Sequence, residues 1–136
     1  MPRILTAFAA GLLAAVLVAC AAPSMPEPPA GQAFFAANCT SCHGADARGG
    51  GPLAADMQPR PTDLTVLARQ NGGVFPAADA LSYIYGDPAD GHLARVMPQF
   101  GDVMDEDLVP IEVEGVLTPT PRALAGLLVY LESIQR

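Results

Sequence analysis

Apolar residues recur at the three- and four-residue spacing of an amphipathic helix in several parts of the chain. They predict helices over residues 31–42, 64–70 and 76–85, and a last helix that begins near Pro121. The last helix has the most regular pattern, an apolar stripe formed by Leu124, Leu127, Leu128, Leu131 and Ile134. Thr120 is its expected N-cap and Pro121 its first helical residue, because proline fits the first turn of a helix.

The segments between these helices are long. Thr62 is the expected N-cap of the helix over 64–70. Residues 102–108 predict one further helical turn, and residues 110–119 an irregular segment, with a small hairpin as the alternative. The fold class is therefore expected to be all-α, with short helices joined by long loops. Such loops need something to pack on, and the apolar content is mostly alanine with no Trp, so we expect a large prosthetic group to supply apolar mass.

Residues 1–19 have the layout of a bacterial export signal. Arg3 precedes the apolar stretch 4–19, which is shorter than the about twenty residues of a membrane span. The last residues of this stretch, Leu17-Val18-Ala19, precede Cys20 and are similar to a lipobox, which predicts that Cys20 is lipidated and becomes the new N-terminus. The alternatives are a simple secreted protein or an uncleaved anchor, each with an incidental Cys20.

Residues 20–30 are expected to form a tether between the lipidated cysteine and a single domain over 31–136. Four prolines favour an extended polyproline form for it, at about 3.1 Å per residue. They are Pro23, Pro26, Pro28 and Pro29.

The chain has 136 residues and a net charge of −7, from 14 acidic residues against seven arginines and no lysine. This balance argues against nucleic acid as a partner. Three cysteines are too few for a disulfide-rich scaffold, so each needs an assignment of its own.

Cys39, Cys42 and His43 form a C-x-x-C-H motif, the attachment signature for haem c. Two thiols three residues apart near a helix end can reach two vinyl groups on one porphyrin edge, and the adjacent imidazole then faces the iron. A structural zinc site would need four ligands, and a thioredoxin-like pair would need a βαβ context; neither is found in the sequence. A plain disulfide would leave His43 without a role.

At this point the chain resembles the class I c-type cytochromes over roughly residues 30–136. The motifs that carry the resemblance are Gly31, Phe35 and the C-x-x-C-H-G run to Gly44, then Gly51-Pro52-Leu53, Met97-Pro98, and the last helix with Tyr130. The sequence departs from the family in lacking Trp and Lys and in the long segment 105–119.

The resemblance implies one covalent haem c, with His43 and Met97 as the axial ligands of its iron. It also implies that the carbonyl of Pro52 accepts a hydrogen bond from the His43 ring, and that the last helix crosses the first near Gly31 and Phe35. For the sixth ligand, Met97 is favoured because Pro98 stiffens the backbone behind it. The other candidates are Met25, Met57, Met104 and His92.

A haem with two protein ligands predicts an electron carrier, with no substrate turned over by its own residues. Its partners are expected to be redox proteins that present a basic patch. The expected location is the periplasmic side of a bacterial cell envelope, with the protein anchored to the membrane by the lipid on Cys20. The alternatives are a haem enzyme or a haem subunit of a larger oxidoreductase with a labile sixth ligand, and a gas or redox sensor. Two sets of side chains are candidates for further roles. Asp102, Asp105, Glu106 and Asp107 could form an acidic docking patch, and Arg60, Arg95, Tyr83 and Tyr85 could bond the haem propionates; the alternatives are a solvated turn, ordinary ion pairs and packing.

Overall fold

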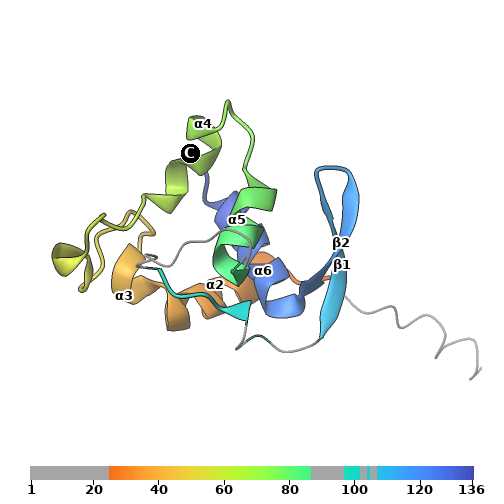
Figure 1. Ribbon diagram of the computed structural model, residues 1–136, viewed down its shortest axis with the longest axis horizontal. Helices are drawn as coiled ribbons and strands as arrows, with labels where there is room; N and C mark the ends of the chain where they lie inside the picture. The colour runs from red at the N-terminus through yellow and green to blue at the C-terminus, as the bar shows by residue number, and fades with distance from the viewer. Residues whose placement is uncertain (1–24, 87–96, 102–103, 105–106) are drawn as a thin grey trace, which may run out of the picture.

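The computed structural model describes residues 25–86, 97–101, 104 and 107–136. Its elements are α2 (Pro28–Asn38), α3 (Thr40–His43), the 3₁₀ turns η1 (Ala54–Asp56) and η2 (Leu64–Val66), α4 (Leu67–Gln70), α5 (Ala77–Tyr85), β1 (Leu108–Val113), β2 (Val116–Pro121) and α6 (Arg122–Ser133). The helices gather around α2 and α6, and the two strands form a separate projection (Figure 1). Within these residues, no helix has the length and apolar character needed to cross a membrane.

The core lies where α2 and α6 cross. A Cβ atom on Gly31 would fall on the backbone carbonyl of Gly126, so the two helices approach at glycine. Beside this point the rings of Phe35 and Tyr130 pack at 5.4 Å between centroids. Phe35 is 2% exposed and Leu124 is fully buried. The predicted crossing of the first and last helices near Gly31 and Phe35 is therefore confirmed.

The first helix begins earlier than the sequence pattern indicated. Pro28 and Pro29, expected in an extended tether, form the first turn of α2. Proline is accepted there because the first amides of a helix have no intrahelical acceptor. The helix then breaks at Cys39, which is both the C-cap of α2 and the N-cap of α3.

The predicted helix over residues 64–70 forms as a 3₁₀ turn, η2, followed by α4. Its N-cap is Asp63 rather than Thr62, since the Asp63 side chain accepts a hydrogen bond from the amide of Thr65 at 2.9 Å. The predicted helix over 76–85 is confirmed as α5, with Pro76 at its N-cap.

The all-α prediction is wrong at residues 108–121, where β1 and β2 form an antiparallel hairpin. Val113 pairs with Val116 across a turn in which Glu114 and Gly115 both have positive φ, 51° and 81°. This is the primed turn that suits a two-residue hairpin loop. The hairpin also absorbs Thr120 and Pro121, so α6 begins at Arg122, one residue later than predicted.

The hairpin projects away from the helices, at the opposite end of the molecule from α3 (Figure 1). Its apolar side chains are among the most exposed of the described residues, with Leu117 70% and Val116 64% exposed. Pro110 and Pro119 face each other in the register, and Arg122 at the base of the hairpin bonds Asp107 at 2.6 Å.

Candidate functional site

Cys39, Cys42 and His43 lie together at the short helix α3. The amide of Cys39 still bonds to Phe35 of α2, and the amide of His43 bonds back to the Cys39 carbonyl, each at 2.9 Å. Both cysteines are half-buried, and neither forms a disulfide. Because they are three positions apart on one helical turn, they lie on the same side of the chain.

A loop closes over the end of α3. The last carbonyls of a helix have no intrahelical donor. Here the carbonyls of Ser41, Cys42 and His43 accept from the amides of Leu53, Gly51 and Gly49, at 2.9, 3.0 and 2.8 Å. The three bonds hold residues 44–53 against the site.

Glycine is required at the closest point of this loop. A Cβ on Gly51 would overlap the carbonyl of Ser41, and it would lie 2.6 Å from both the carbonyl of Thr40 and the carbonyl carbon of Cys42. All three are backbone atoms, which cannot rotate away.

The His43 ring is buried, at 8% exposure, and its Nδ1 lies 3.0 Å from the carbonyl oxygen of Thr62. Since a carbonyl only accepts, Nδ1 carries the proton and Nε2 keeps its lone pair. Burial lowers the pKa of His43, and the bond to Thr62 offsets part of that shift. The ring is therefore neutral at pH 7, the form that binds a metal ion through Nε2.

The acceptor of this bond is a correction to the sequence analysis. Pro52 was expected to accept it, but Pro52 lies exposed in the loop and the carbonyl of Thr62 accepts instead. A backbone carbonyl leaves no side-chain signature, so the role of Thr62 could not be predicted from its residue type.

The thiol at Cys39 stays protonated at neutral pH. Burial and the neighbouring Cys42 raise the pKa of Cys39 to about 11.

Met97 is half-buried and packs against the hydrophobic core. The segment after it is fixed to other elements, since the amide of Phe100 bonds to Ile84 of α5 at 3.0 Å, and the Phe100 ring meets the edge of Phe34 in α2. Met104 also packs against this core, so burial alone does not separate the two methionines. Met57 directly follows η1. The candidates His92 and Arg95, and the lipidation candidate Cys20, lie outside the described residues.

The core next to these groups is rimmed by half-buried apolar side chains. Half-buried apolar side chains from several segments pack on the same cluster as Cys39. They include Leu64, Leu67, Ala68, Ala77, Ala80, Leu81, Met97 and Phe100. Such a set leaves apolar surface open to cover, as a porphyrin would.

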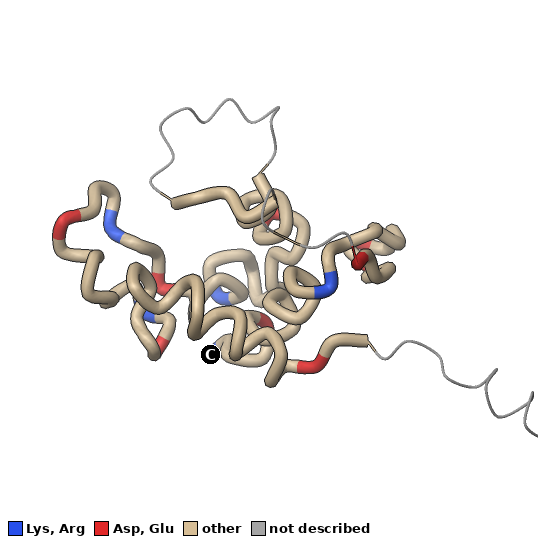
Figure 2. Tube along the Cα trace, turned by 90° about the horizontal axis from the view of Figure 1, so that it is seen from below, with Lys and Arg blue, Asp and Glu red and all other residues tan. Residues whose placement is uncertain are grey.

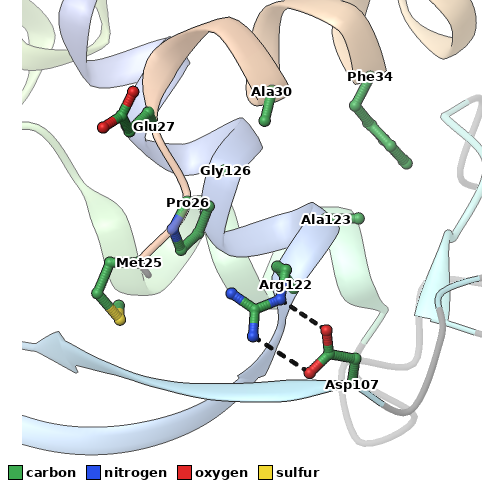
Figure 3. A pocket seen from close by; sticks show the side chains of 9 residues that line it. All are labelled: Met25, Pro26, Glu27, Ala30, Phe34, Asp107, Arg122, Ala123 and Gly126. Atoms are coloured by element: carbon green, nitrogen blue, oxygen red, sulfur yellow. Dashed lines mark hydrogen bonds and ion pairs between the residues drawn. The ribbon is translucent and has the colours of Figure 1, made fainter. Parts of the chain in front are cut away.

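A cavity of about 780 Å³ lies elsewhere, at the starts of α2 and α6. Its walls include Met25, Phe34 and the ion pair between Arg122 and Asp107 (Figure 3). Neither cysteine of the motif nor His43 borders it, so it is separate from the site at α3. Met25, a candidate sixth ligand, lines this separate cavity.

The family model described as Cytochrome c matches residues 29–111, which is more than half of the chain. No curated protein and no solved structure gives a significant match. The family match covers the motif at α3, the loop over residues 44–53 and Met97.

Proposed function

The chain belongs to the cytochrome c family and carries covalently bound haem c, and on this basis we propose that it is a class I, single-haem electron carrier. The observation that carries the proposal is the state of His43. It is a buried, neutral imidazole whose Nδ1 donates to the Thr62 carbonyl, and it directly follows the second of two cysteines that form no disulfide.

Cys39 and Cys42 are the proposed attachment residues. They would hold the haem through two thioether bonds, each formed by addition of an S–H across one vinyl group, with the hydrogen going to the neighbouring carbon and without net oxidation. The reaction needs reduced thiols, and neither cysteine forms a disulfide in the structure.

His43 and Met97 are the proposed axial ligands. The bound haem supplies a reversible one-electron change at its iron. His43 offers the Nε2 lone pair, and the carbonyl of Thr62 fixes the ring plane. Met97 is held on the core by the segment that follows it, and a thioether ligand raises the reduction potential. With both positions filled by side chains, small molecules find no open site.

The proposed partners are redox proteins with a basic patch, met at the outer face of a bacterial inner membrane or in the periplasm. The net charge of −7 supports this pairing, because complementary charge speeds brief redox encounters. On the described chain, acidic residues and arginines are interspersed (Figure 2). Of the expected acidic patch, residues 102, 105 and 106 lie outside the described residues. Its fourth member, Asp107, forms an ion pair with Arg122.

Production of the full chain in a host that attaches haem c tests the proposal. We expect a band that stains for haem after denaturing electrophoresis, and loss of that band in the C39S/C42S variant. Ser41→Ala is the matched control, since it changes an exposed side chain between the cysteines and leaves the motif intact. A colourless unmodified chain would overturn the proposal.

Two further measurements test the finer statements. Ferrous protein that does not bind carbon monoxide readily indicates a carrier, whereas rapid binding indicates a haem enzyme with an open position. Cys20→Ala is expected to move the protein from the membrane to the soluble fraction, and retention in the membrane would refute the lipid anchor.

A further inference from the structure

The residues that follow α6 reach back to the segment beside Thr62. The Nε of Arg136 donates to the hydroxyl of Thr65 at 2.7 Å, and its second nitrogen donates to Asp63 Oδ2 at 3.1 Å. The amide of Arg136 also bonds to the Thr65 carbonyl at 3.0 Å. Arg136 is thus tied to this segment through three groups.

Asp63 and Thr65 complete the network. Asp63 Oδ1 accepts from both the amide and the hydroxyl of Thr65, at 2.9 and 2.6 Å. These bonds, with that from Arg136, hold the pKa of Asp63 below its usual value. We call Asp63, Thr65 and Arg136 the Arg136 latch.

Gln135 ties the same segment to α6. Its Nε2 donates to the carbonyls of Leu64 and Leu131, each at 2.7 Å, and its Oε1 accepts from the amide of Ala68 at 2.9 Å. Since α6 packs on α2, which ends at Cys39, the position of η2 is fixed relative to the site.

We propose that the Arg136 latch positions the Thr62 carbonyl against His43 and thereby sets the reduction potential of the iron that His43 holds. Thr62 is itself exposed and immediately precedes Asp63, so its carbonyl is held through its neighbours. On the far side of Asp63, the amide of Leu64 bonds to Ala47 at 2.8 Å. The inference rests on the proposed function, because it takes His43 as the ligand.

The direction of the effect follows from the hydrogen bond. A firm bond from Nδ1 makes the imidazole a stronger electron donor, which favours ferric iron and lowers the potential. Loosening the latch weakens this bond and raises the potential. The charge of Arg136 acts in the opposite sense, because removing a cation near the iron favours the ferric state. The sign of the shift therefore separates positioning from simple electrostatics.

Redox titration of the full holoprotein tests the proposal with Arg136→Gln. We expect the ferrous-to-ferric ratio at a fixed ambient potential to rise about threefold, an upward shift of about 30 mV at 59 mV per factor of ten. Asp63→Asn should shift the potential in the same direction. In the D63N/R136Q double variant the shift should equal that of either single variant, whereas two opposite Coulomb effects would cancel.

Arg122→Gln is the matched control, because it breaks a comparable exposed ion pair with Asp107 at the base of the hairpin. We expect it to leave the potential unchanged. The ring Nδ1 proton, followed by NMR in the ferrous state, should exchange faster in R136Q than in R122Q.

An unchanged or lower potential in R136Q, with covalent haem and the wild-type spectrum retained, would overturn the latch alone. Absence of covalent haem from the unmodified chain would instead contradict the proposed function.

Discussion

The two ends of the molecule are built by different means. At the α3 end, three successive helix carbonyls accept from one loop, and His43 is buried with its ring proton bonded to Thr62. At the hairpin end, two strands pair with each other and leave Leu117 and Val116 more than half exposed. Hydrogen bonds hold the α3 end to the neighbouring loops. The hairpin joins the helices near its base, where Asp107 pairs with Arg122.

The difference shows where the fold needs positional accuracy. A ligand to iron must keep its place through each electron transfer, so its surroundings are fixed by short bonds to backbone atoms. A projecting hairpin can change its side chains with little effect on that geometry. Changes at the α3 end should therefore alter spectrum and stability, and equivalent changes at the hairpin should alter neither by much.

The largest expected contrast is spectroscopic. Met97→Ala should abolish the weak far-red band of ferric, methionine-ligated haem and lower the potential while the haem stays attached, because the thioether ligand is lost. Leu117→Ala at the hairpin should leave the visible spectrum unchanged. Met104→Ala is the sulfur control, and loss of the band in that variant instead would transfer the ligand role to Met104.

A smaller contrast is expected in stability. Gly51→Ala forces a Cβ onto backbone carbonyls of α3 and should lower the free energy of unfolding by about 3 kcal/mol, the upper part of the range for overpacking. Gly115→Ala in the hairpin turn meets no atom within 4 Å and has only its φ of 81° to oppose it, at about 1 kcal/mol. Urea unfolding of the two holoproteins measures the difference, and equal losses would show that the loop can shift to admit the methyl group.

The smallest expected contrast is in how the stability depends on pH. Hydrogen bonds with Thr65 lower the pKa of Asp63, and those with Arg122 lower the pKa of Asp107. A lowered folded pKa means that each carboxylate stabilises the protein above its unfolded pKa of about 3.9, and that this contribution is lost as the pH falls through the folded value.

Urea unfolding between pH 6 and pH 2 should therefore show a loss of stability on acidification that is reduced in both D63N and D107N. Only D63N should also change the potential. A shift of the potential in D107N would contradict the separation of the two ends.

Some features could be predicted because one side chain or one period carried them. The stripe of α6 follows from leucine spacing. The crossing at Gly31 was implied by the resemblance to the class I c-type cytochromes, and the structure shows the close approach there. The motif at Cys39, Cys42 and His43 is local, so its helical neighbourhood could be derived without tertiary information.

Other features depend on contacts that the local pattern does not contain. Pro28 and Pro29 suit either an extended tether or the first turn of a helix, and packing of α2 on α6 selects the helix. The sequence pattern favours Thr62 as an N-cap through its hydroxyl. In the structure its backbone carbonyl accepts the hydrogen bond from His43 instead. The prolines near residues 110–121 favoured an irregular segment, because proline is compatible with a strand only where its nitrogen is not needed as a donor.

The facing pair Pro110 and Pro119 affects how the hairpin can associate with other chains. In an antiparallel ladder whose first bonded pair is Val113 with Val116, both prolines fall at positions whose nitrogens point outward along the two free edges. Neither edge can offer a donor there to an approaching strand from a neighbouring copy. The two prolines therefore oppose edge-to-edge pairing at this point of the exposed apolar hairpin.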